Sequence, residues 1–432
     1  MSDWMLPNGL RVVFRPLPGR RTACLGVTMH VGSRHERAGE EGAAHLVEHL
    51  AFRDTARYSA TQITDMRERL GGGFEAGTEK EFTSYTATVP AHAAWRALDL
   101  LASQVREPLF REDDVARERR IVLQELSEAE EDFEDRTGVL AEELLFGGAL
   151  GREIAGSRRS VRALDHSAIR RFHRRTYSPK RAVVFAVGDV DRRRLGREVE
   201  RLFGDWNGRA APAAAPLTLP DRMRAKVLRR SSSSAQVVLA FPGMAGTASD
   251  RELQTQGVLS AMLGATEGSR LFHAIRDHAA LAYNVESYTS VYTDVGLFAI
   301  SFGVPGGGVR RALEIALREM RALCEHPTPG EFARAIESLE ARMLLDAESP
   351  WLIGREEARS ALLGRKVSSV EARLRSLRAI TLDDVRALAH QLFTARCAVL
   401  AMVGEPRLPA PQRWLRERLR AGYFVPSSGQ KP

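Results

Sequence analysis

The second half of this chain repeats the pattern of the first half. A shift of 216 positions, half of the 432 residues, lays Leu164 on Ile380, and a helix, a short break and a glycine-ended strand then recur in register. The further aligned pairs are Ile169 with Val385, Phe172 with Leu388, Tyr177 with Phe393, Val183 with Val399, Val187 with Val403 and Gly188 with Gly404. Several matches of one kind at one spacing favour a duplicated domain over coincidence.

A Pro/Ala-rich stretch with no periodic face separates the two halves. It lies between Gly208 and Pro220 and is typical of a linker. We therefore expect an N-terminal domain at 1–207, a linker at 208–220 and a C-terminal domain at 221–432. Two domains of about 200 residues are also what a chain of this length favours.

Apolar spacing predicts strands and helices within the first half. Residues 10–16 and 22–31 are expected to pair as a hairpin. One unusually long helix is expected from Glu112 to about Leu145. The remaining predicted elements are strands at 81–89 and 182–187, and helices around His45, from the capping box at Ser59 to Leu70, at 93–105 and at 163–177.

Composition is that of a globular protein, with 44% hydrophobic and 27% charged residues. The first residues lack a basic segment followed by an apolar run, so no signal peptide is expected, and no stretch holds eighteen apolar residues. The three distant cysteines fit a reducing compartment, so a cytoplasmic location is expected. The formal charge of +8 raises the question of nucleic acid, but the arginines are scattered among acidic runs and no binding motif accompanies them. A solvated basic surface is the favoured interpretation.

Two histidines and a glutamate stand together in His45-Leu46-Val47-Glu48-His49. In a helix, positions i, i+3 and i+4 share a face, so both imidazoles and the Glu48 carboxylate project to one side. Two imidazole nitrogens one turn apart can hold a metal ion, which leaves Glu48 free to take a proton from a water beside it. This H-x-x-E-H pattern is the inverzincin signature and arises by chance in about 3% of chains of this composition. The alternative is a surface helix with incidental histidines, because a site needs a third ligand.

Two glutamates further along the chain, Glu118 and Glu125, are candidates for that ligand. They are seven residues apart, which is two helical turns, so their carboxylates face the same way. One of them would bind the metal while the other supports a ligand histidine from behind, or both would belong to a solvated charged face.

The second half lacks these ligands. A shift of 215 positions places Ser260, Leu263 and Gly264 where the first half has His45, Glu48 and His49. Only the first half is therefore expected to hold an ion.

Together these motifs resemble those of the M16 metallopeptidases, the pitrilysin and insulin-degrading-enzyme group, and most of all its short processing-peptidase-like branch. The resemblance implies that His45, His49 and Glu125 bind one zinc ion per chain, that Glu48 is the general base and that Glu118 supports a ligand. It also implies an α+β fold of two homologous domains of the LuxS-like metallohydrolase type, each a mostly antiparallel sheet packed with helices.

Two further stretches carry the resemblance. Residues 70–78 look like the family's substrate-aligning strand, so Glu75, Ala76 and Thr78 are expected to bind an extended peptide along a sheet edge. Residues 268–285 are similar to the family's Arg/Tyr element, which implies that Arg276 and Tyr283 bind the substrate backbone and stabilise the oxyanion.

Two positions depart from the family's pattern. Glu75 stands where the family usually has asparagine, and Asp54 replaces a glycine. A carboxylate beside the scissile bond would repel acidic residues, favour basic ones or raise a neighbour's pKa.

The function implied by the resemblance is that of a zinc-dependent endopeptidase, a hydrolase that cuts peptides or unfolded segments inside a clamshell chamber. A homodimer is expected, or a heterodimer with a related M16 subunit, with no nucleic acid or membrane as partner. One alternative is a non-catalytic or assembly subunit, although such members usually lose a zinc ligand or the base, and all four residues are present here. The other is a nucleic-acid-binding protein with a structural zinc, which a two-His-one-Glu set with an adjacent base argues against.

Overall fold

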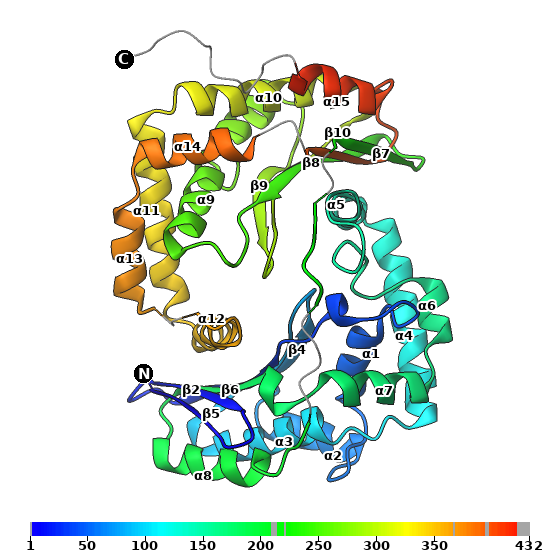
Figure 1. Cartoon of the computed structure of the whole chain (residues 1–432), viewed down its shortest axis with the longest axis vertical. Helices are drawn as coiled ribbons and strands as arrows, with labels where there is room; N and C mark the ends of the chain where they lie inside the picture. The colour runs from blue at the N-terminus through cyan, green and yellow to red at the C-terminus, as the bar shows by residue number, and fades with distance from the viewer. Residues whose placement is uncertain (1, 209–213, 220–221, 366–367, 394–396, 421–432) are drawn as a thin grey trace. The chain divides into compact units, whose positions relative to one another are not determined.

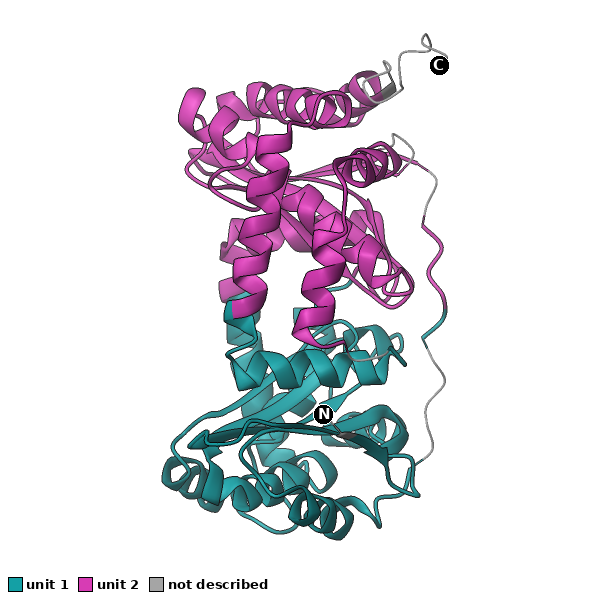
Figure 2. Ribbon diagram, turned by 90° about the vertical axis from the view of Figure 1, so that its left-hand side faces the viewer, with its two compact units in different colours: residues 1–127, 152–215, 345–367 teal, residues 128–151, 216–344, 368–432 magenta. Residues whose placement is uncertain are grey.

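The computed structural model of the chain describes residues 2–208, 214–219, 222–365, 368–393 and 397–420. It contains two compact units, coloured separately in Figure 2. Unit 1 comprises residues 1–127, 152–215 and 345–367, and unit 2 comprises residues 128–151, 216–344 and 368–432. The predicted linker lies partly outside the described residues, and its described part, 214–219, is neither helix nor strand.

Unit 1 holds a six-stranded sheet and the helices around it (Figure 1). Its strands are β1 (Ser2–Met5), β2 (Arg11–Pro16), β3 (Thr22–Met29), β4 (Phe74–Thr78), β5 (Thr83–Pro90) and β6 (Ala182–Gly188). Its helices are α1 (Ala43–Leu50), α2 (Ala60–Arg69), α3 (Ala94–Arg106), most of α4 (Glu112–Glu131), α6 (Arg158–Ala163), α7 (His166–Thr176), α8 (Arg192–Phe203) and α12 (Pro350–Leu362), with single turns η1 (Ser33–His35), η2 (Ala91–Ala93) and η3 (Pro179–Arg181).

Unit 2 holds a five-stranded sheet of the same kind. Its strands are β7 (Arg224–Arg229), β8 (Ser234–Gly243), β9 (Val285–Val291), β10 (Gly296–Pro305) and β11 (Val399–Gly404). Its helices are α5 (Phe133–Leu145), α9 (Asp250–Leu263), the π-helix η4 (Phe272–His278), the turn η5 (Gly306–Gly308), α10 (Val309–Glu325), most of α11 (Pro329–Asp346), α13 (Val370–Arg378), α14 (Leu382–Leu392) and α15 (Pro411–Arg420).

The two sheets share one topology, which confirms the predicted duplication. The strand orders are β1-β2-β6-β3-β5-β4 and β7-β11-β8-β10-β9. Each sheet has one parallel pair, β2 with β6 or β7 with β11, and its other pairs are antiparallel. Both β6 and β11 end at a glycine with positive φ, Gly188 and Gly404. The fold is thus α+β with two homologous, mostly antiparallel domains, as predicted.

The predicted hairpin of residues 10–16 and 22–31 is wrong. Both strands exist as β2 and β3, but β6 lies between them and pairs with each. Every residue of β6 is buried. A strand that is apolar on both faces belongs in the interior of a sheet, so β6 takes the place beside β2 that the chain-adjacent β3 was expected to fill.

The single long helix predicted from Glu112 to Leu145 is also wrong, because it is broken at Asp132. Residue 132 has an extended backbone (φ −79°, ψ 107°), and its carboxylate accepts the N–H groups of Glu134 and Asp135 as an N-cap. An aspartate that caps the following helix competes with continuation of the preceding one. The break starts α5, which belongs to unit 2.

Each unit receives one helix from the other half of the sequence. In unit 2, α5 packs on β11 and β8, where Leu140, Ala141 and Leu145 join the core. In unit 1, α12 packs on β6 and β3 through Ala358 and Ala361. The close approach of α12 to β6 also depends on Gly354, because a Cβ at that position would lie 2.2 Å from the ring of Phe185.

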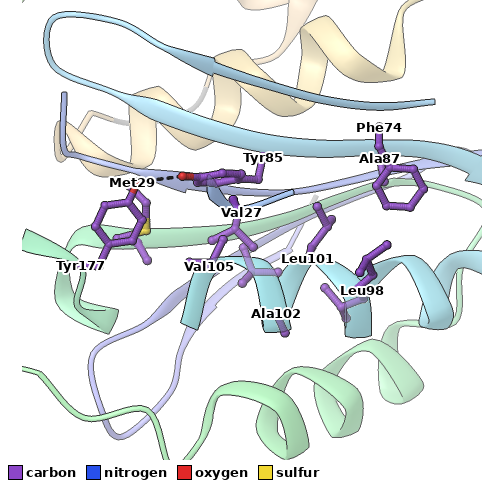
Figure 3. Close-up of a cluster of buried hydrophobic side chains, with 14 of the residues drawn as sticks. Val27, Met29, Phe74, Tyr85, Ala87, Leu98, Leu101, Ala102, Val105 and Tyr177 are labelled. Carbon is purple, nitrogen blue, oxygen red and sulfur yellow. Dashed lines mark hydrogen bonds between the residues drawn. The ribbon is translucent and has the colours of Figure 1, made fainter. Parts of the chain in front are cut away.

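The opposite face of the unit 1 sheet carries the larger core, shown in part in Figure 3. There α3 lays Leu98, Leu101 and Val105 against β3 and β5. The buried hydroxyls of Tyr85 and Tyr177 form a hydrogen bond with each other at 2.9 Å. This layer of strands and helices is the support on which α1 is placed.

Candidate metal centre and active site

Helix α1 is held by its apolar face and by a buried carboxylate at its start. Leu46, Val47 and Leu50 are buried in the core of unit 1. Glu36 accepts the backbone N–H of Ala44 (2.8 Å) and of Gly42 (3.1 Å). Burial raises the pKa of Glu36 to about 8, although these two bonds favour its charged form. With its apolar side fixed in this way, the helix presents its polar side away from the core.

The predicted ligands His45, His49 and Glu125 come together on that polar side. Glu125 Oε2 lies 3.5 Å from His49 Nε2 and 3.9 Å from His45 Nε2, and the donor atoms of all three lie within 4.8 Å of one another. Ligands around a tetrahedral zinc at ordinary bond lengths are separated by about 3.4 Å. The donor set therefore fits one zinc ion, and it is the only group of three such residues found among the described residues.

Glu118 lies behind His49, opposite the side that faces Glu125. Its Oε2 is 3.1 Å from His49 Nδ1, and its Oε1 accepts Arg53 Nε at 2.6 Å. Burial works against charge on both groups, but it is outweighed: the bond to Glu118 raises the pKa of His49, and the bonds to His49 and Arg53 lower the pKa of Glu118. The Glu118 bond places the proton on Nδ1 and leaves Nε2 as the free ligand atom.

His45 is held in its neutral, metal-binding form. Burial lowers its pKa to about 4, helped by the neighbouring His49. Its buried Nδ1 has no hydrogen-bond partner among the described residues. The ring therefore offers a nitrogen lone pair at neutral pH without first losing a proton.

Glu48 lies beside the ligand set and against strand β4. Its carboxylate accepts hydrogen bonds from the hydroxyl and the backbone N–H of Thr78. Burial raises the pKa of Glu48, and these bonds and His49 partly offset the rise. A carboxylate with a raised pKa, held in place by neighbours, is suited to accept and return a proton.

The predicted substrate-binding residues lie on β4, the last strand of the unit 1 sheet, but on different faces of it. Ala76 packs toward the core that supports α1, and Thr78 bonds Glu48 on that side. Because side chains alternate along a strand, Glu75 projects from the opposite face, where it influences the pKa of Cys24. The carboxylate that the sequence placed beside the scissile bond thus lies on the far face of the sheet.

The predicted Arg/Tyr element lies in unit 2. Arg276 is in η4, and its guanidinium carbon is 5.0 Å from the ring centroid of Tyr283 and 4.5 Å from that of Phe272. Tyr283 is 78% exposed just before β9. The two side chains are stacked, with the phenol in solvent.

Comparison with known proteins identifies the family. Residues 11–158 match the model described as Insulinase (Peptidase family M16), and residues 163–339 match the model described as Peptidase M16 inactive domain. An uncharacterized zinc protease of Streptomyces coelicolor is 36% identical over 92% of this chain and 88% of its own length. The chain belongs to the M16 peptidase family.

Other M16 relatives and solved structures agree with this assignment. The uncharacterized zinc protease YmxG of Bacillus subtilis is 29% identical over 93% of this chain and 98% of its own. A protease from Helicobacter pylori superimposes with a TM-score of 0.86 at 21% identity, covering 93% of this chain and 98% of that one. An M16 inactive domain from Pseudomonas fluorescens gives 0.86 at 20%, covering 94% and 98%. At these identities the structures show that the M16 fold is shared.

Sequence reasoning missed three supports of the M16 site. Arg53 holds Glu118, Glu36 holds the start of α1, and Thr78, expected only to bind substrate, also bonds Glu48. Arg53 lies beyond the end of α1 at Leu50, so helical spacing did not place it behind His49. Glu36 and Thr78 reach the site through tertiary contacts that sequence spacing does not predict.

None of the helices in the described ranges has the length and apolar character needed to cross a bilayer.

Proposed function

We propose that this chain is a zinc-dependent endopeptidase. The observation that carries the proposal is the convergence of His45 Nε2, His49 Nε2 and the Glu125 carboxylate, with the Glu48 carboxylate beside them. The names of its relatives in Streptomyces coelicolor and Bacillus subtilis, both zinc proteases, support it. Zinc, when bound by these three residues, supplies Lewis acidity that polarises a peptide carbonyl and makes a water molecule more acidic.

The chain's own residues would carry the remaining steps. Glu48 takes a proton from the attacking water and returns it to the leaving amine, and Thr78 holds the carboxylate in position. Glu118 and Arg53 keep His49 in the tautomer that binds metal. Arg276 and Tyr283, by their resemblance to the family's element, would contact the substrate backbone and the developing oxyanion.

The substrate of this proposal is a peptide or an unfolded segment in extended form. Strand β4 ends the sheet of unit 1, and an extended peptide can add to such an edge through main-chain hydrogen bonds. This placement brings the peptide backbone alongside Thr78, the residue that bonds Glu48.

Replacement of the base tests the proposal. Glu48→Gln is expected to retain about one zinc per chain and to lose at least a hundredfold in turnover of a mixed peptide library, because an amide cannot accept the proton. Glu112→Gln, a matched change at an exposed position of α4, is the control and is expected to behave as wild type. Zinc content is measured by elemental analysis and cleavage by mass spectrometry. Full activity of the zinc-loaded Glu48→Gln protein would refute the assignment of the base, and a wild type that binds zinc but cleaves no peptide would favour the alternative of a non-catalytic subunit.

A further inference from the structure

The open edge of β4 has a defined hydrogen-bonding register. Gly73 O accepts Thr88 N–H at 2.7 Å, and Glu79 N–H donates to Phe82 O at 2.7 Å, so the odd-numbered residues of this segment bond β5. In an antiparallel pair the alternate residues turn their N–H and C=O groups the other way. The main-chain groups of Phe74, Ala76 and Thr78 therefore point to the open edge.

Both ends of this edge are already bonded. At one end, the Thr78 N–H donates to Glu48. At the other, the Phe74 N–H donates to Gly72 O at 2.8 Å and the Phe74 carbonyl accepts Arg67 Nη2 at 3.3 Å. The main-chain N–H and C=O groups of Ala76, between these two ends, remain available to bond an added strand. At about 3.3 Å per residue, Thr78 and Phe74 are about 13 Å apart along the strand, so Glu48 and Arg67 mark two points about four residues apart.

Arg67 is held at its end of the edge by the turn between α2 and β4. Its carbonyl accepts Gly72 N–H at 2.8 Å, and its guanidinium carbon lies 4.7 Å from the ring centroid of Phe52. Gly71 and Gly72 both adopt positive φ, which glycine tolerates, and so make this turn tight. The cation is therefore placed by backbone bonds and a ring contact rather than by a flexible stem alone.

Arg67 is a half-buried cation without an anionic partner. Among the described residues no carboxylate lies within ion-pair distance of its guanidinium, and the one hydrogen bond of that guanidinium goes to Phe74 O. Burial lowers its pKa, and no neighbouring carboxylate offsets this. The next arginine of the same helix, Arg69, differs in both respects, since it is exposed and paired with Asp65 at 2.8 Å. A guanidinium has five N–H donors, so Arg67 retains donors for an incoming carboxylate.

We propose that Arg67 selects peptides that carry an acidic side chain three or four residues from the bond that is cut. The proposal rests on the proposed function, because a peptide added to β4 with its reacting carbonyl beside Glu48 passes Arg67 at that distance. Glu75 does not oppose it, because that carboxylate projects from the other face of the strand. The preference for acidic residues is opposite to the one that Glu75 suggested from sequence.

Matched peptides test this specificity. A fluorescence-quenched peptide that the zinc-loaded protein cuts is remade with Glu or Gln at each position within five residues of the cut. We expect wild type to prefer the Glu peptide about tenfold in kcat/KM, mainly through KM, at a position three or four residues away. Arg67→Met, which keeps an apolar stem over Phe52, should bring the Glu/Gln ratio to about one. Arg67→Lys should restore part of it, and Arg67→Glu should reverse it. The control Arg69→Met should retain the wild-type ratio and basal activity.

Binding of the same pairs to zinc-free wild type, followed by fluorescence anisotropy, separates the two proposals. Tighter binding of the Glu peptide without cleavage by the zinc-loaded protein would support selection by Arg67 and refute the endopeptidase. Cleavage without any Glu preference, or an unchanged preference in Arg67→Met, would overturn the role of Arg67 and leave the endopeptidase standing. Failure of all peptides both to bind and to be cut would overturn both.

Discussion

Removal of the Glu118 carboxylate should weaken zinc binding without removing a ligand. Glu118 is buried, its Oε2 lies 3.1 Å from His49 Nδ1, and it pairs with Arg53 on its other oxygen. Loss of a carboxylate that orients a ligand histidine typically costs 10- to 100-fold in metal affinity. This corresponds to about 1.4–2.7 kcal/mol. The upper part of that range is expected for Glu118→Ala, because the bond is buried and Arg53 loses its partner.

Glu118→Gln should lie between wild type and Glu118→Ala. Its amide oxygen can still accept the Nδ1–H of His49, but the charge that favours this tautomer is gone. Zinc affinity is measured by competition with a chromophoric chelator at pH 7.5, and peptide turnover is measured at saturating zinc. Glu112→Gln, exposed on the same helix, is the control. A zinc Kd in Glu118→Ala equal to that of wild type would refute the assigned support, as would a loss as large as that of Glu125→Ala, which removes a ligand.

Two further predictions concern proton release and assembly. At pH 6, zinc binding should release about one proton, from His49 alone, because burial keeps the pKa of His45 at about 4 while the bond to Glu118 raises that of His49. Calorimetry in buffers of different ionisation heat gives the number of protons released per zinc bound, and release of two protons would contradict this prediction. If homodimers combine the zinc of one subunit with Arg276 and Tyr283 of the other, coexpression of inactive Glu48→Gln and Tyr283→Phe chains should restore about a quarter of wild-type activity, because about half of the dimers are mixed and each mixed dimer has one intact site of two. No recovery in isolated mixed dimers would count against shared sites.

The site was predictable as far as helical periodicity reaches. Spacing alone places His45, Glu48 and His49 on one face, and the seven-residue interval turns Glu118 and Glu125 the same way. The approach of the two glutamates of α4 to the polar face of α1 depends on tertiary packing. The resemblance to a known family supplied that pairing, whereas the residues by themselves left a solvated face as an alternative.

The errors in the fold have one physical cause, which is that distant partners override local signals. Strands β2 and β3 are neighbours in sequence, yet the wholly buried β6 separates them. The helical pattern runs through residue 132, yet a single aspartate side chain caps a new helix there. The compact units change over between residues 215 and 216, inside the linker expected at 208–220, and each unit also includes a helix from the other half of the sequence.

That exchange predicts that the two halves of the sequence do not fold alone. A fragment of residues 1–207 lacks α12 and leaves one face of its sheet uncovered, including Val13, Val183, Phe185 and Val187. Burial of each such side chain contributes about 1.5–3 kcal/mol, so the four together contribute about 6–12 kcal/mol. This is comparable to the whole stability of a domain, about 5–15 kcal/mol.

The isolated fragment should therefore be insoluble, or bind a hydrophobic dye and melt without cooperativity. Coexpression with residues 221–432 should restore soluble, cooperatively melting protein, because that fragment supplies both α12 and the strands β8 and β11 on which α5 packs. As a control, Gly354→Leu in the coexpressed partner should abolish the rescue, since its side chain would overlap the ring of Phe185. A monomeric fragment of residues 1–207 with a sharp thermal transition would show that α12 contributes little. In that case the sheet face beneath it must be stable without a cover, and the exchange of helices would not be what couples the folding of the two halves.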